Sequence, residues 1–377
     1  MLQNTGDYEK QTKDYRNLGL PVYFYTFTPR PLTSGGFFTL DDELSALLIQ
    51  ARSQLGILEG ITKYIPDRGI LQDLMMLKES HYSRLIDYSG DYFSLMLKSI
   101  SSNKNKTNDV FNIVSAYRHS LSQNANCIAL SQIYTIAMHG QNADIKLGVR
   151  KEAIHLSRPF STLREYNPTA PEKIPPALAD ITEFLTNDMT TDVLVKAALA
   201  HYQFEMIHPF ECYNGIIGRM MIPMIINNHS IKAAPFLGLS EVLYFYKNDY
   251  FDILRSTQYS GGYIALIKFF TEKIYLSAKL ASAQIQNIAN IIAEDKSKLT
   301  ANNPSNSTLL VYEYFKKNLV AEIRTISETC GISYNTAAKA VDQLLEMNIL
   351  VLDRLQSRNR KFVYDRLIGA LSSIDRP

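Results

Sequence analysis

The stretch HPFECYNGIIGR, residues His208 to Arg219, decides the fold and raises the question of function. Apolar segments flank it, TDVLVKAALAHYQFEMI before and MMIPMIINN after, so it is predicted to connect two helices. Asn214 and Gly215 stand at the start of the second helix, where backbone N–H groups lack intrahelical acceptors and the helix dipole favours an anion. The stretch therefore predicts a phosphate-binding loop.

Two side chains of this loop suit phosphoryl chemistry. His208 is the only side chain in the stretch that ordinarily accepts a proton near neutral pH, so it is the candidate general base. Arg219, one turn into the helix, can neutralise a phosphate with its planar fork. A histidine at a helix end can also serve packing alone. A Cys212–His208 nucleophile pair is a minor alternative, because nothing else in the loop orients such a pair.

The composition is that of an ordinary soluble globular protein, with 377 residues of which 46% are hydrophobic and 20% charged. The formal net charge of +2 is too small to require a polyanion partner. Cys127, Cys212 and Cys330 lie far apart and form no C-x-x-C pair, which favours reduced thiols. Because the N-terminal segment is polar and no apolar run could span a bilayer, the sequence predicts a cytoplasmic protein without a membrane partner.

Helical periodicity dominates the first three quarters of the chain. Helices are expected from Asp41, around residues 70–87, 108–122 and 127–140, and again from Ile174. Residues 1–40 are rich in aromatic residues, Pro and Gly and predict an extended arm lying on another surface. Residues 149–176 have too many Pro and β-branched or aromatic residues for a helix, so they predict a short hairpin followed by an extended segment.

The C-terminal part is predicted to be a separate unit. AEDKSKLTANNPSNST, residues 293–308, is polar and rich in Asn and Ser, which is typical of a linker. Three helical segments follow, the third with Ser333 as its N-cap, and then two strands around a polar turn, which together predict a winged helix-turn-helix. Its basic residues would suit DNA phosphates, although acidic residues nearby leave a protein contact open. These basic residues are Arg354, Arg358, Arg360, Lys361 and Arg366.

The loop and its flanks resemble the Fic family, whose members transfer AMP from ATP to a protein hydroxyl and share the pattern H-P-F-x-D/E-G-N-G-R-x-x-R. The resemblance rests on AALAHYQFEMIHPFECYNGIIGRMMIPMII and covers most of residues 20–275, with segments such as LKESHYSRLIDY, LGVRKEAIHL and YFYKNDYFDIL in the family's order. It implies a mainly α fold: a Fic helical core with a short β-hairpin flap, an N-terminal helical extension and, as in part of the family, a C-terminal winged helix-turn-helix. The expected domains are 1–105 (arm and helical extension), 106–292 (Fic core), 293–306 (linker) and 307–377 (winged helix-turn-helix).

The resemblance assigns a role to each matching loop residue. His208 matches the base that deprotonates the target hydroxyl, and Asn214 and Gly215 match the cradle of the α- and β-phosphates. Arg219 matches the second arginine of the pattern, which holds the γ-phosphate, and Gly218 is grouped with these nucleotide-binding residues. Tyr250, in KNDYFDIL, matches an aromatic residue near the adenine, with a buried core tyrosine as an equal alternative.

Three positions depart from the family pattern. Cys212 stands in the place of the acidic residue that binds magnesium, Tyr213 in that of the first glycine and Ile216 in that of the first arginine. A thiol is a poor ligand for magnesium, and a bulky side chain hinders the approach of backbone to a phosphate. Glu211, next to Cys212, is the remaining candidate ligand for Mg or Mn, and metal binding stays open.

A second motif of the larger Fic proteins, S/T-x-x-x-E-G/N, carries a glutamate that pairs with the second arginine and blocks productive ATP binding. SRLIDY matches it, with Ser83 in the place of the serine and Asp87 in that of the inhibitory glutamate. Aspartate is shorter by one methylene, and Tyr88 replaces the small residue that follows. A bridge from Asp87 to Arg219 and a solvated helix residue are the two alternatives.

The flap residues Thr162, Leu163, Arg164 and Glu165 resemble the strand against which target peptides pair through main-chain hydrogen bonds. The expected function is transfer of AMP from ATP to a hydroxyl of a protein, with the protein itself among the candidate targets, at a weak rate or from an altered donor. The alternatives are a catalytically impaired nucleotide sensor or regulator that acts through its winged helix, and a purely structural interaction protein. Whether the chain is an enzyme, and whether it forms a homo-oligomer, stays open.

Overall fold

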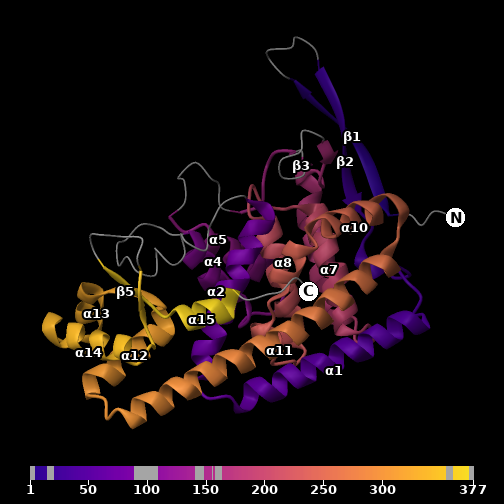
Figure 1. Ribbon diagram of the computed structural model, residues 1–377. Helices are drawn as coiled ribbons and strands as arrows, with labels where there is room; N and C mark the ends of the chain where they lie inside the picture. Colours follow the sequence, from indigo (N-terminus) through magenta and orange to yellow (C-terminus); the bar gives the residue numbers. More distant parts are fainter. Residues whose placement is uncertain are drawn as a thin grey trace.

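The computed structural model describes residues 5–14, 21–88, 109–140, 148–154, 156–157, 164–353 and 360–372, and it is mainly helical (Figure 1). The helices are α1 (Asp42–Tyr64), α2 (Arg68–Asp87), α4 (Asp109–Ser120), α5 (Cys127–Ala137), α6 (Ile174–Asn187), α7 (Val193–Ile207), α8 (Asn214–Asn228), α9 (Leu239–Phe245), α10 (Lys247–Ser260), α11 (Tyr263–Ala301), α12 (Asn306–Asn318), α13 (Ile323–Cys330), α14 (Tyr334–Glu346) and α15 (Asp365–Ser372). The strands are β1 (Gly6–Asp14), β2 (Pro21–Pro29), β3 (Leu156–Ser157), β4 (Arg164–Tyr166), β5 (Val320–Glu322), β6 (Val351–Leu352) and β7 (Lys361–Val363).

The centre of the helical body is the pair α7 and α8, which pack on each other. Every residue of α7 is buried, as expected of a helix that is surrounded on all sides, and α8 is buried from Ile216 to Ile226 with Pro223 inside it. The long helices α1 and α11 run side by side next to this pair (Figure 1). The predicted loop therefore lies inside the body, held by neighbours that come from distant parts of the chain.

The predicted helices form close to their expected ranges. Asp41 is the N-cap of α1, where its carboxylate accepts a hydrogen bond from the Leu44 N–H at 2.7 Å. The helices expected around 70–87, 108–122 and 127–140 are α2, α4 and α5, and the helix expected from Ile174 is α6. The short flap hairpin forms from β3 and β4, which pair antiparallel, while Thr162 and Leu163 lie outside the described residues.

The described residues of the predicted arm are extended and β2 packs on α7, but β1 and β2 also pair with each other, which the sequence analysis did not predict. They form an antiparallel hairpin with Gly6 opposite Pro29 and Asp14 opposite Pro21, and its far end projects from the helical body (Figure 1). The aromatic and β-branched residues form cross-strand pairs, such as Tyr8 with Phe27, whose ring centroids lie 5.0 Å apart. Prolines end the strand and do not interrupt it.

The linker predicted at 293–306 is wrong over most of its length, because α11 continues to Ala301. Asp295 of this segment is fully buried and accepts hydrogen bonds from the Tyr364 hydroxyl at 2.5 Å and from Arg366 Nη1 at 2.7 Å. Leu299 is buried as well. The charged residues of the segment thus lie on a helix whose inner face packs on the C-terminal unit, and only residues 302–305 lie between the helices.

The C-terminal unit contains the three predicted helices α12, α13 and α14 and the strands β6 and β7. Ser333 caps α14 and accepts a hydrogen bond from the Thr336 N–H at 3.1 Å, as predicted. The additional strand β5 pairs with β7, which gives a three-stranded sheet of order β5-β7-β6. The last helix, α15, packs on α11 and α2. Classification of this unit as a winged helix-turn-helix stays a prediction.

None of the helices in the described part of the chain is long and apolar enough to cross a membrane.

Candidate functional site

The loop between α7 and α8 is closed by its own asparagine. His208 ends α7 with φ of 49°, and Tyr213 precedes α8 with φ of 61°, so both residues lie in the left-handed region. The Asn214 side chain accepts a hydrogen bond from the Phe210 N–H at 2.8 Å and donates one to the Phe210 carbonyl at 2.9 Å. Because its amide group is engaged in this way, Asn214 can offer a phosphate its backbone N–H at the start of α8.

Arg150 supports the loop from outside and had no role in the sequence analysis. Its Nε donates to the His208 carbonyl at 2.8 Å, and its Nη2 donates to the carbonyls of Ile207 and Thr169. The Arg150 N–H also donates to the Pro209 carbonyl at 2.8 Å. Arg150 is 3% exposed, so one buried guanidinium satisfies two carbonyls at the end of α7 and that of Thr169.

Replacing Arg150 by methionine is expected to lower the free energy of unfolding by about 3 kcal/mol, because buried carbonyls lose their donor. Urea unfolding followed by circular dichroism measures the change. The control is Lys151→Met, since Lys151 is exposed and its loss should cost no more than about 0.5 kcal/mol. Equal unfolding midpoints for the two variants would rule out the supporting role of Arg150.

Arg219 is fully buried and is held by the end of α2. Its Nη2 donates to Asp87 Oδ2 at 2.7 Å and its Nη1 to Asp87 Oδ1 at 3.3 Å, while its Nε donates to the Ser83 hydroxyl at 3.0 Å. The structure thus brings Asp87 into contact with Arg219, as one alternative of the motif comparison had it, and adds Ser83 as a second partner. Burial opposes the charge on Arg219, yet Asp87, together with Tyr250 and Glu205, outweighs it and raises the pKa of the guanidinium further above its ordinary value.

The Asp87 carboxylate also lies over the N-terminus of α8. A Cβ atom on Gly215 would come within 2.8 Å of Asp87 Oδ2 and 2.9 Å of Arg219 Nη1, so a larger residue here would have to displace this ion pair. Asp87 therefore has the place next to Gly215 and Arg219 that the sequence analysis gave to nucleotide phosphates. In this structure the anion at the helix N-terminus is a side chain of the protein itself.

Two of the departures from the family pattern contact each other. The rings of Tyr88 and Tyr213 pack edge to face with their centroids 5.9 Å apart. The Arg84 guanidinium lies 4.5 Å from the centre of the Tyr88 ring and 5.8 Å from that of Tyr213. The end of α2 is thus attached to the loop by an aromatic contact in addition to the Asp87–Arg219 ion pair.

The residues at the expected metal position do not fit magnesium. The Cys212 thiol lies 3.5 Å from Met138 Sδ and 3.8 Å from the Tyr134 hydroxyl, and burial raises its pKa, which also argues against a Cys212–His208 nucleophile pair. Glu211 is exposed to solvent. Within the described ranges no group of three His, Cys, Asp or Glu side chains could hold a metal ion.

The base candidate His208 lies in a mostly buried position, with 16% of its side chain exposed. Burial, followed by the nearby Arg150 charge, lowers its pKa to about 3, so the ring is neutral at physiological pH. Glu205, one turn earlier on α7, is 6% exposed, and burial raises its pKa to about 8. Its Oε2 lies 3.9 Å from His208 Nδ1.

Gly218 and Tyr250 lie in the interior, on the side of Glu205 that faces away from His208. A Cβ atom on Gly218 would overlap Glu205 and come within 3.2 Å of His201 Nδ1, so Gly218 allows α8 to approach α7 closely. Tyr250 is 1% exposed, with its hydroxyl 3.0 Å from His201 Nε2. Its position matches the core alternative of the sequence analysis.

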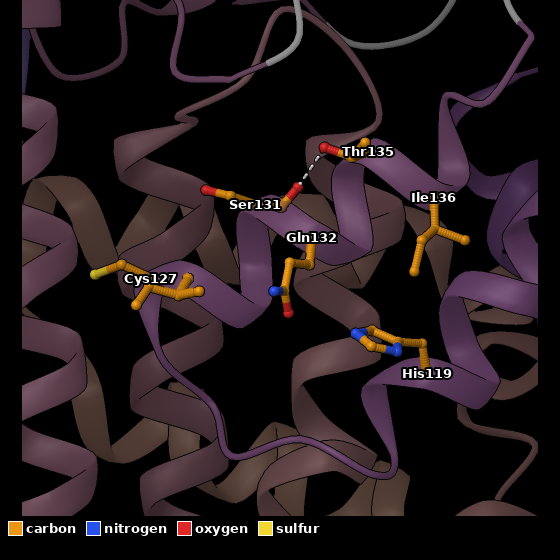
Figure 2. Close-up of a pocket in the computed structure, with 7 residues that line it drawn as sticks. His119, Cys127, Ser131, Gln132, Thr135 and Ile136 are labelled. Atoms are coloured by element: carbon orange, nitrogen blue, oxygen red, sulfur yellow. Dashed lines mark hydrogen bonds between the residues drawn. The ribbon is translucent and has the colours of Figure 1, made fainter.

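A separate pocket of about 560 Å³ lies between the end of α4 and the outer face of α5. Figure 2 shows His119 across from Gln132 and Ile136, with Ser131 and Thr135 on the same helix α5. The inner face of the same helix carries Tyr134, which stacks on Phe210 of the loop at 4.3 Å. Helix α5 therefore separates this pocket from the loop.

The fold and the loop together define a class: a helical protein with a His-Pro-Phe turn between two buried helices and an anion position at the start of the second. Residues 128–226 match the Fic/DOC family model, a range that holds the loop and both of its helices. Residues 128–226 of the chain therefore form a Fic/DOC domain.

Two relatives carry names that describe an activity. A probable protein adenylyltransferase of Aquifex aeolicus is 30% identical over 94 residues, which are 25% of this chain and 27% of that protein. Protein adenylyltransferase fic-1 of Caenorhabditis briggsae is 34% identical over 64 residues, 16% of this chain and 13% of its own length. The chain thus matches only about a quarter or less of these relatives' lengths.

The crystal structure of a Fic family protein from Desulfovibrio desulfuricans G20 superimposes with a TM-score of 0.57. The match covers 88% of this chain and 98% of that chain at 15% sequence identity, and it shows the likeness of the fold.

Proposed function

We propose that the protein transfers AMP from ATP to a hydroxyl group of a protein, with His208 as the general base. The observation that carries the proposal is the placement of a neutral imidazole in the loop that leads into α8, the helix whose N-terminus and Arg219 are the candidate phosphate contacts. The adenylyltransferase names of the two relatives support the same reaction.

In the proposed reaction the target oxygen attacks the α-phosphorus of ATP. The hydroxyl proton passes to His208, the bond between the α-phosphorus and the bridging oxygen breaks, and pyrophosphate leaves. The backbone N–H groups of Asn214 and Gly215 would bind phosphate oxygens, and Arg219 would hold a phosphate with its two Nη groups. No step is assigned to a metal, because Cys212 faces sulfur and Glu211 faces solvent.

Asp87 makes the described state an inhibited one under this proposal. Its carboxylate bonds to both Nη atoms of Arg219 and lies beside Gly215, so a nucleotide phosphate would have to displace it from both. Ser83 accepts from the same guanidinium and keeps it turned toward α2. Tyr88 and Tyr213 add to the contact, and both would have to separate for the end of α2 to leave.

The reaction is tested with two labelled forms of ATP, one carrying the label at the α-phosphate and the other at the γ-phosphate. AMP transfer predicts labelled protein only with the α-label. Label from the γ-phosphate would indicate phosphoryl transfer instead and would contradict the proposal.

A nucleotide sensor is the second candidate, and the altered loop favours it. Ile216, in the place of the first arginine of the family pattern, is fully buried and provides no charge to a nucleotide. The sensor would bind ATP through Arg219 and Gly215 without transferring AMP. Binding without any label transfer is the result that supports this candidate over the first.

We propose that the target protein docks on the strand of the flap. A second copy of this protein is one of the candidate targets. Arg164 and Glu165 lie in β4, which pairs with β3, and further main-chain pairing with a target peptide would need no particular side-chain sequence.

The C-terminal unit is proposed to bind DNA weakly. Arg366 forms ion pairs with Asp295 and Glu294, so it is not available to DNA phosphates. Arg360, in contrast, is exposed. A mixed-sequence duplex should be retarded in gels at about 50 mM salt and released at about 200 mM. The Arg360→Ala, Lys361→Ala double variant should weaken this shift. An absence of retardation at the lower salt concentration would point to a protein contact.

A further inference from the structure

Glu205 is a buried carboxyl group that the proposed reaction does not yet use. It sits three residues before His208 on α7, and the left-handed turn at His208 brings the imidazole back over the last turn of the helix. Glu205 Oε2 lies 3.9 Å from His208 Nδ1. On its other side the carboxyl rests against the Cα of Gly218, where any larger residue would overlap Oε1. The chain thus makes room for an acid beside the imidazole.

The charged and titratable groups around this acid come from several elements. Arg219 of α8 favours its ionised form, whereas Asp87 of α2 opposes it. Tyr250 of α10 and His201 of α7 lie on the interior side, and His201 is neutral because burial lowers its pKa to about 3. Arg150 acts on His208 from the other side of the ring, where it opposes protonation. Among the described residues, the acidic group within 4 Å of the His208 ring is the carboxyl of Glu205.

We propose that Glu205 is a positioning residue for His208. The Glu205 carboxylate lies against Gly218 on the Nδ1 side of the His208 ring. There it balances the positive charge that His208 gains when it accepts the proton of the target. The inference rests on the proposed role of His208 as a base. An imidazole buried beside Arg150 is a weak base by itself, and an opposite charge within 4 to 6 Å raises a pKa by about 1 unit or more. The proton that Glu205 loses goes to solvent before the transfer step, and the target's proton goes to the His208 nitrogen that faces away from Glu205.

The first test follows the carbon and nitrogen resonances of the His208 imidazole as a function of pH, without nucleotide. In the wild type the resonances should shift once when His208 itself titrates and again near pH 8, when Glu205 ionises. The inflection near pH 8 should be absent in Glu205→Gln. The control is Glu183→Gln, an exposed acid on α6 that should leave the inflection in place. Persistence of the inflection in Glu205→Gln overturns the proposal.

The second test measures AMP transfer between pH 6 and 9. The wild-type rate should rise toward pH 8, while Glu205→Gln should give a flat profile that is about tenfold lower at pH 8. Equal profiles would also overturn the proposal. If AMP transfer is absent even when the protein also carries Asp87→Ala, although the resonances show the inflection, the proposed function fails and the coupling of Glu205 to His208 stands.

Melting temperatures establish that Glu205→Gln folds. The folded-state pKa of about 8 lies above the ordinary 4.5, so the wild type loses stability as pH rises between these values. The glutamine variant carries no such cost and should melt higher than the wild type at pH 8, with little difference at pH 5. A lower melting temperature at both pH values would indicate a structural role for the carboxyl and would count against the proposal.

Discussion

Replacing Asp87 by alanine is expected to raise the affinity for ATP by about tenfold to a hundredfold. In the wild type a phosphate must displace a carboxylate that holds Arg219 through two hydrogen bonds, and a charge-assisted bond of this kind is worth about 1.5–3 kcal/mol. Isothermal titration calorimetry with ATP measures the change. The matched control is Asp73→Ala, because Asp73 is an exposed acid on the same helix that pairs with Arg118.

The same substitution should destabilise the protein when no nucleotide is present. Arg219 is 1% exposed and would be left with only Ser83 as a partner from α2, at a cost on the order of 2 kcal/mol. ATP should therefore raise the melting temperature of Asp87→Ala more than that of the wild type. Equal ATP affinities for Asp87→Ala and Asp73→Ala would contradict an inhibitory role of Asp87.

Replacing His208 by alanine should lower the rate of AMP transfer by about 10²- to 10⁴-fold, the usual contribution of a general base. The affinity for ATP should change little, because the phosphate contacts proposed for Arg219 and the start of α8 do not involve the imidazole. The rate is measured with ATP labelled at the α-phosphate, in a background that also carries Asp87→Ala. His229→Ala is the control, since His229 is exposed at the end of α8. An undiminished rate in the His208 variant would remove the base from the mechanism.

The sequence predicts much of this architecture because its main signals are local. Apolar periodicity predicts α1, α2, α4 and α5, and side-chain caps such as Asp41 and Ser333 mark helix starts. The pairing of Asp87 with Arg219 could be expected because both residues match motifs whose members meet in the family, and the structure places them in contact.

Residues that act through tertiary contacts could not be predicted in this way. Arg150 lies 58 residues before the loop it supports, and nothing near it in sequence indicates that its partners are the carbonyls of α7. The polar segment at 293–301 resembles a linker by composition, but Asp295 finds its partners Tyr364 and Arg366 about 70 residues later. Such contacts override local propensity.

The departures at Tyr88 and Tyr213 show the same limit. Taken one at a time, each is a bulky residue in the place of a small one. The structure brings their rings together beside Arg84, so the two changes form a single contact between α2 and the loop. A signal of this kind lies in the pair and not in either position alone.

The most direct test of the central claim is intact-mass spectrometry of the purified protein after incubation with ATP and either magnesium or manganese. The samples are the wild type, Asp87→Ala, and Asp87→Ala combined with His208→Ala. The Asp87 variant should carry the added mass of AMP, the wild type less of it and the double variant none. An adduct that persists without His208, or no adduct on Asp87→Ala although it binds ATP, would contradict AMP transfer with His208 as the base.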